Sequence, residues 1–332
     1  MKLMDRASVM LCALLLIFAG CVREDLVVQV DKDEENDVVI STELSNGRVQ
    51  CIAEDSRGFM WIGTFRGLNR YDGNEYHQYF CTYDSLGLSD NNIQDIMSDS
   101  QGRLWVCTAN GVCRYTSYDS FESIPIQSHN KNARKLMEDS RGNILMYNNI
   151  GLFRYNPLRE VFEPVVRRTN LSRDNYWSDC FLCDNDDILI LEKQKITRYS
   201  RDGFNLVRTT NLRIAPQDTY YAELFDDGML LISGHGSLLL YDTGTDRVVR
   251  MDGEMRRRIT ANGNAVLDAC PLKNGSILMS MSKGQVFMLD LNAGTLKENT
   301  DKDFAYNVPN AYITCLFEDS RRNIWLDRKS HV

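Results

Sequence analysis

Proline and basic residues are scarce in this chain. Its 332 residues include six prolines, too few for a Pro-rich linker that would divide it. Lysine and arginine together number 38 against 46 aspartates and glutamates, so the formal net charge is −8. Because a nucleic-acid surface needs clustered basic side chains, we expect no nucleic-acid partner. The hydrophobic and charged fractions, 43% and 25%, are typical of a soluble folded protein.

Long apolar runs are also lacking, except near the N-terminus. Residues 7–20 are almost wholly apolar and follow Lys2 and Arg6. At about 1.5 Å per residue, this run is too short for a helix to cross a hydrocarbon core of about 30 Å. We therefore expect residues 1–21 to be a signal peptide and residues 22–37 a linker. The protein is expected to be exported, and to be periplasmic or anchored to a membrane only through its N-terminus.

The cysteines predict one modification and no disulfide framework. The segment that ends in Cys21 resembles a bacterial lipobox, which predicts lipidation of Cys21; an ordinary signal peptide with an incidental cysteine is the alternative. Cys180 and Cys183 form a Cys-x-x-Cys without the second pair typical of zinc sites. Cys107 and Cys113 flank a predicted hairpin turn, across which they could meet. We expect no metal, no cofactor and no catalytic residue.

The dominant feature is an internal repeat. Its best copies carry an Asp-Ser turn followed by an apolar strand, and they span residues 54–64, 98–108, 138–146 and 318–326. An apolar residue shortly after each turn gives seven register marks, spaced 40 to 47 residues apart: Met60, Leu104, Ile144, Ile188, Leu230, Ile277 and Ile324. Short β segments repeated every 40–50 residues or so are typical of propeller blades. The sequence therefore predicts an all-β, seven-bladed β-propeller over residues 38–332.

Each repeat also makes sense as local chemistry. In the first, four strands are expected near residues 49–53, 59–63, 68–71 and 75–80. Between the first two strands, the Asp55 side chain can bond the backbone two residues on, and Gly58 can adopt a positive φ. The structural residues expected in such turns are Asp55, Gly58, Asp99, Gly102, Asp139, Gly142 and Asp319. Those expected to pack between blades are Trp61, Trp105, Ile144 and Trp325.

The ends of the repeat region predict how the ring closes. By register, residues 38–41 match the fourth strand of a blade, so we expect them to be the outer strand of the seventh blade. Residues 311–317 and 323–326 would supply its first two strands, and then the copy breaks. The sequence thus predicts an incomplete seventh blade. We interpret the break as a truncation or frameshift, with partial representation of a larger protein as the alternative.

Residues 54–73 closely resemble the two-component regulator propeller repeat, which builds the periplasmic sensor regions of hybrid two-component systems. The resemblance covers about residues 38–326 and is most specific in the first two repeats. It implies two propellers, a β-sandwich, a membrane helix and a histidine kinase in a complete sensor, with an oligosaccharide as ligand. This chain has one propeller and no phosphoacceptor histidine in a helical context, so we expect no kinase activity. The four histidines lie in strand or loop contexts: His77, His129, His235 and His331.

Three functional hypotheses follow. The first is a truncated sensor's ligand-binding propeller, with an oligosaccharide as partner and a homodimer through the propeller. The second is a glycan-active propeller enzyme, which needs paired carboxylates at a defined separation. Because the recurrent aspartates are explained by turns, only a cluster of carboxylates converging at the central channel would favour it. The third is a free-standing exported propeller or a non-functional remnant of a sensor gene.

Overall fold

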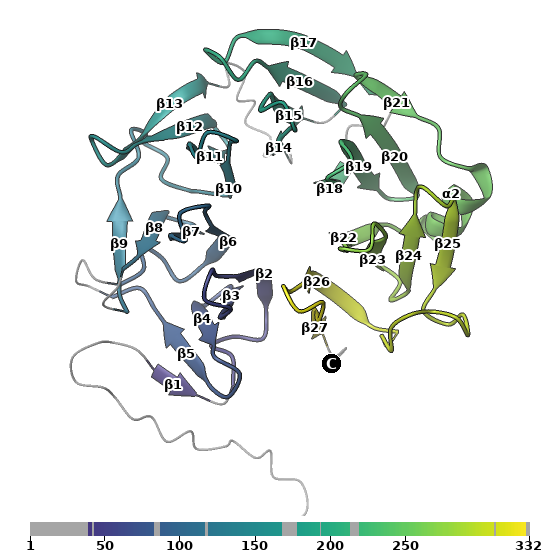
Figure 1. Cartoon of the computed structure of the whole chain (residues 1–332), viewed down its shortest axis with the longest axis horizontal. Coiled ribbons are helices and arrows are strands. Elements are labelled where there is room, and N and C mark those ends of the chain that lie inside the picture. The colour runs from purple at the N-terminus through teal and green to yellow at the C-terminus, as the bar shows by residue number, and fades with distance from the viewer. Residues whose placement is uncertain are drawn as a thin grey trace, which may run out of the picture. The chain divides into compact units, whose positions relative to one another are not determined.

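The computed structural model describes residues 39–41, 43–82, 87–116, 119–167, 178–192, 194–212, 219–308 and 310–329. The predicted signal peptide, the linker, the lipidation site Cys21 and His331 lie outside these ranges. The described residues belong to one compact unit. Within it, antiparallel sheets stand side by side around a central channel (Figure 1). The predicted all-β propeller is therefore confirmed.

Six sheets are blades, each with its first strand innermost, and in all but the first the fourth strand is outermost (Figure 1). The first three blades are built from β2 (Val49–Glu54), β3 (Met60–Thr64), β4 (Gly67–Tyr71) and β5 (Tyr76–Tyr79); β6 (Ile93–Ser98), β7 (Leu104–Thr108), β8 (Gly111–Tyr115) and β9 (Phe121–Ile124); and β10 (Lys135–Glu138), β11 (Ile144–Asn148), β12 (Gly151–Asn156) and β13 (Val161–Arg167). The next three are built from β14 (Ser178–Leu182), β15 (Ile188–Glu192), β16 (Lys195–Tyr199) and β17 (Leu206–Asn211); β18 (Thr219–Leu224), β19 (Met229–Gly234), β20 (Ser237–Asp242) and β21 (Arg247–Val249); and β22 (Val266–Pro271), β23 (Ile277–Met281), β24 (Val286–Asp290) and β25 (Thr295–Glu298).

The prediction of seven blades was wrong. After the sixth blade, the last repeat supplies only β26 (Tyr312–Glu318) and β27 (Ile324–Lys329), which form a two-stranded sheet. The predicted donation of the N-terminal strand was also wrong. Strand β1 (Val39–Ser41) pairs antiparallel with β5 and becomes a fifth strand of the first blade. A donated outer strand needs a third strand to pair with, and the described part of the last sheet has only two.

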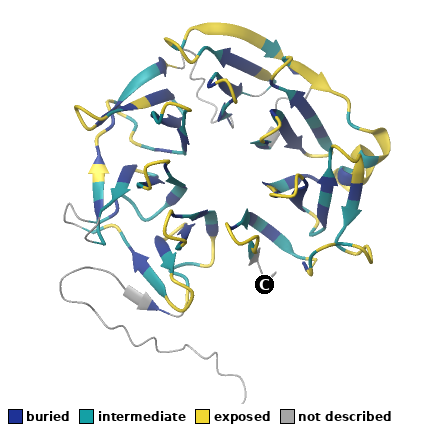
Figure 2. Cartoon of the chain, viewed as in Figure 1, coloured by how far each residue is buried: buried dark blue, intermediate teal, exposed yellow. Residues whose placement is uncertain are grey.

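The hydrophobic core lies between neighbouring sheets. Second strands such as β3, β7, β11 and β23 are buried at every position, because both of their faces pack against other blades. Outer strands β17 and β21 are largely exposed (Figure 2). Each pair of neighbouring sheets shares one apolar cluster. The cluster that closes the ring, between the last sheet and the first blade, is small, with Val49, Ile62 and Cys315 as its buried members.

A short helix, α2 (Gly253–Ile259), was not among the elements predicted from the sequence, which were all strands. The Asp252 carboxylate caps it by accepting from the backbone N–H groups of Glu254 and Met255. At seven residues, the helix is too short for a periodic apolar pattern, and only Ile259 is buried. Within the described ranges, no helix combines the length and apolar character needed to cross a membrane.

Candidate binding site in the central channel

The aspartates predicted at the turns bind the indoles predicted in the core. Trp61 Nε1 donates to Asp55 Oδ2 at 3.0 Å, and Trp105 Nε1 donates to Asp99 Oδ2 at 2.8 Å. Asp319 accepts from Trp325 in the same way at 2.9 Å. Burial opposes ionisation of these carboxyls, but the hydrogen bonds hold the pKa of each below its usual value. These three aspartates thus accept hydrogen bonds that stabilise the turns, which explains why they recur in the repeat.

The third and last turns differ from this pattern. Asp139 has no tryptophan six residues on and binds the Asn143 side chain instead, at 2.7 Å. Gly58, Gly102 and Gly142 have φ between 75° and 84°, whereas the last turn places Arg322 in that position with φ 68°. Trp61, Trp105 and Ile144 are buried. Trp325 is only partly buried, because its sheet is not a complete blade.

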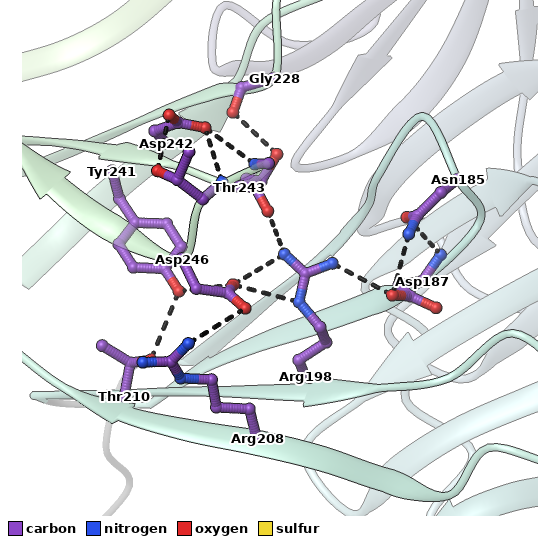
Figure 3. Close-up of polar contacts among 12 residues, drawn as sticks. Asn185, Asp187, Arg198, Arg208, Thr210, Gly228, Tyr241, Asp242, Thr243 and Asp246 are labelled. Carbon is purple, nitrogen blue, oxygen red and sulfur yellow. Dashed lines mark hydrogen bonds and ion pairs between the residues drawn. The ribbon is translucent and has the colours of Figure 1, made fainter.

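Arg-Tyr pairs recur in the third strand of the first four repeats, and three of their four arginines bond to the next blade: Arg70, Arg114 and Arg198. Arg70 in the first blade donates at 2.7 Å to the Tyr115 hydroxyl of the second. Arg198 in the fourth blade donates to Asp246, after β20 of the fifth, at 2.8 Å (Figure 3). Arg198 also binds Asp187 at 3.1 Å and the Thr243 carbonyl oxygen. These arginines therefore act in packing between blades.

A second repeated position, not predicted from the sequence, lies on the inner strands, and its side chains in five consecutive sheets line a cavity in the central channel. In five of the inner strands the pairing register shifts just before it, which marks a β-bulge. The register marks would have found it, since it lies nine residues before each of them. Its occupants are Cys51, Asp95, Lys135, Asp179, Tyr221, Asp268 and Cys315.

Two of these carboxylates are bonded to the next inner strand. Asp95 Oδ2 accepts from the Leu136 backbone N–H at 2.7 Å. Asp268 Oδ2 accepts from the Leu316 backbone N–H at 2.5 Å. Burial raises the pKa of Asp95 and of Asp268 to about 6, against the lowering effect of these hydrogen bonds. Both groups thus join the inner strands of neighbouring sheets.

Lys135 and Glu223 sit among these carboxylates. Lys135 Nζ lies 3.5 Å from Asp179 Oδ1 and 4.2 Å from the centre of the Phe181 ring. Burial alone would lower the pKa of Lys135, but Asp179 and the neighbouring carboxylates raise it above its usual value. Burial raises the pKa of Glu223 to about 7, although Lys135 opposes the rise. Carboxylates do converge at the channel, together with a cation.

The channel side chains line a cavity of about 280 Å³. Five consecutive inner strands and the residues just before them contribute to it, so it opens inside the ring and not on the outer rim. Its polar lining mixes amides, hydroxyls, carboxylates and cations. The lining residues are Gln50, Cys51, Gln94, Asp95, Arg134, Lys135, Tyr147, Ser178, Asp179, Tyr221, Ala222 and Glu223.

The other candidate chemistry from the sequence does not assemble. Cys107, Cys113, Cys180 and Cys183 are buried free thiols. Among the described side chains, no group of three or more His, Cys, Asp or Glu residues could hold a metal ion. The described histidines are also outside the channel wall, since His77 lies in β5 and the other two, His129 and His235, lie between strands.

Comparisons with known proteins agree with the repeat. The family model described as "Two component regulator propeller" matches residues 43–66 and 87–110, in the first two repeats. Among curated proteins, no sequence matches this chain.

Solved structures share the fold at low sequence identity. The extracellular domain of the hybrid two component system BT3049 from B. thetaiotaomicron has a TM-score of 0.68 at 17% identity, over 86% of this chain and 39% of that one. The corresponding domain of BT4673 from the same organism has a TM-score of 0.65 at 17% identity, over 85% and 39%. Virginiamycin B lyase from Staphylococcus aureus has a TM-score of 0.62 at 12% identity, over 88% and 95%. The chain thus spans about two fifths of the length of the sensor domains, and it carries the two-component regulator propeller repeat on a propeller fold like theirs.

Proposed function

We propose that this chain is a ligand-sensing propeller of an exported two-component sensor, with an oligosaccharide as its ligand and no catalysis of its own. The observation that carries the proposal is the matching repeat in the first two blades, on a fold shared with extracellular domains of hybrid two-component systems. The polar channel cavity gives such a ligand a place to bind. Signalling output would require kinase domains, which the propeller itself does not supply.

Several features of the proposal rest on the sequence. Export through residues 1–21, lipidation of Cys21 and a periplasmic location follow from the N-terminal segment. A homodimer through the propeller belongs to the same proposal. Intact-mass measurement of the membrane fraction tests the N-terminus: a lipidated protein begins at Cys21 after cleavage of residues 1–20 and carries the mass of a diacylglyceryl group, which a Cys21→Ser variant lacks.

The binding proposal is tested with the full chain and a panel of plant and host oligosaccharides. Isothermal titration calorimetry should detect saturable binding of at least one oligosaccharide. A matched titration with the same protein after urea unfolding controls for non-specific heat. Absence of binding across the panel, by a protein shown to be folded, would overturn the sensing proposal.

The carboxylate cluster favours a second candidate, a glycan-active lyase or hydrolase. Asp95 and Asp268 already bind backbone N–H groups, however, and Lys135 is held at Asp179. A general acid and base must reach the substrate, and these bonded groups are poorly placed for that role. Chromatography of the same oligosaccharides after long incubation should show no new products. A product that disappears in a Glu223→Gln variant would establish catalysis instead.

A further inference from the structure

The channel cavity has the size of one sugar residue. Pockets for drug-sized ligands usually measure roughly 300–1,000 Å³, so a cavity of about 280 Å³ suits a smaller group. An oligosaccharide could place only its terminal residue there. The rest of the chain would extend out of the channel.

The lining is rich in hydrogen-bond acceptors. The amide nitrogens of Gln50 and Gln94 donate to Asn92 Oδ1 at 2.6 and 2.7 Å, which fixes both side chains. Within the described part of the chain, neither amide oxygen receives a hydrogen bond in return, so both can accept from a ligand. The carboxylates Asp179 and Glu223 add further acceptors. Sugar hydroxyls are the donors that match them.

The charges of the cavity disfavour an anion. Two cations, Arg134 and Lys135, face three carboxylates, those of Asp95, Asp179 and Glu223. Both cations also have protein partners, since Arg134 donates to the Asn149 side chain at 2.8 Å and Lys135 pairs with Asp179. Lys135 is thus committed to Asp179, and an acidic sugar would meet the carboxyl groups of Asp95 and Glu223 with only Arg134, which is bonded to a neutral amide, to offset them.

We infer that this cavity binds the terminal residue of a neutral oligosaccharide and rejects an acidic one. The inference rests on the proposed sensing function and adds to it the place and the charge of the ligand. Gln94 and Glu223 would be the specificity-determining side chains, from strands β6 and β18 on different sides of the cavity.

The test uses the full chain, with methyl glycosides of glucose, galactose and mannose as neutral probes and glucuronic and galacturonic acid as acidic ones. Saturation-transfer NMR should show contact with a neutral probe, and the acids should bind at least tenfold more weakly. Glu223→Gln and Gln94→Leu should each weaken the neutral probe about tenfold, the loss expected for one good polar contact. Glu75→Gln, the same chemical change at an exposed turn, should leave binding unchanged.

The outcomes separate this inference from the sensing proposal. If an oligosaccharide binds but both channel variants bind it as well as the parent protein, the inference is wrong and sensing stands. Acids that bind as tightly as neutral sugars also overturn it. If no sugar of any length binds, both proposals fail. Urea unfolding of each variant checks that the fold is intact, and the two variants lie on different strands so that one misfolded protein does not decide the result.

Discussion

Replacing Arg198 by leucine should weaken the contact between the fourth and fifth blades. The arginine side chain is 8% exposed and binds Asp187 and Asp246, each with a side chain 17% exposed (Figure 3). The substitution would leave two largely buried carboxylates without their main cation. Breaking such a buried pair usually costs about 3–5 kcal/mol of unfolding free energy.

Three contacts that remain reduce this cost. Asp246 keeps the Tyr241 hydroxyl at 2.9 Å and Arg208 at 3.9 Å. Asp187 keeps the Asn185 side chain at 3.0 Å. We therefore expect a loss at the lower end of that range, about 3 kcal/mol.

Urea unfolding followed by circular dichroism measures this loss. Arg154→Leu is the matched control, because Arg154 occupies the same repeat position in the third blade but is exposed. Its expected cost is about 0.5 kcal/mol or less. If Arg198→Leu costs no more than Arg154→Leu, the assignment of Arg198 as a link between the fourth and fifth blades is refuted. Combining Arg198→Leu with Asp246→Asn should cost less than the sum of the two single changes.

Three further predictions concern turns and the channel. Asp99→Asn removes the charged acceptor of the Trp105 indole N–H and should lower the free energy of unfolding in urea by about 1–2 kcal/mol. Asp139→Asn, in a turn without tryptophan, should lower it less, and equal losses would contradict a special role of the indole bond. Arg322→Gly should stabilise the protein by about 1 kcal/mol, because φ 68° is unfavourable for a residue with a Cβ; a lower unfolding midpoint would disprove it. Burial raises the pKa of Glu223 from 4.5 to about 7 in the folded state. Between pH 4.5 and 7 the folded protein therefore keeps a proton that the unfolded chain has released, so the free energy of unfolding should fall as the pH rises through this range. In urea unfolding at a series of pH values, Glu223→Gln should remove up to about 3 kcal/mol of this pH-dependent loss of stability, whereas Glu75→Gln should leave the loss in place. Identical pH profiles for the two variants would count against the raised pKa of Glu223.

The repeat allowed the sequence to predict most of the blade architecture. Six of the seven register marks are the first residue of a second strand, and Leu230 is the second residue of β19. The register marks were also correct in the middle of the chain, where the repeat is faint, because turn residues and short apolar runs are local signals of strands. The four strands expected in the first repeat lie within one residue of β2 to β5 at nearly every end.

Pairing at the ends of the repeat region was not predictable in the same way. The local pattern of residues 38–41 indicates a strand, but it does not say which edge the strand joins. In the structure, β1 pairs with β5, the outer strand of the first blade. The described part of the last repeat forms the two-stranded sheet of β26 and β27, beside six blades.

The channel cluster was missed for a different reason. Its members have unlike chemistry, from Cys51 through Lys135 to Tyr221, so they do not look like a repeat. Only their shared distance from the register marks reveals them. The carboxylate cluster that the sequence analysis named as a condition for catalysis therefore exists, but it was found by the fold. Its bonds to neighbouring strands favour binding over catalysis.

Hydrogen–deuterium exchange with and without a bound neutral oligosaccharide tests whether the propeller binds sugars in its central channel. If the propeller senses sugars through its channel, the ligand should slow exchange at amides of the inner strands β6, β10, β14 and β18 and leave the outer strands unchanged. Another cavity, of about 630 Å³, lies beside the third blade and is lined in part by His129, Phe153 and Arg167. Protection confined to that cavity or to the outer strands would contradict the account.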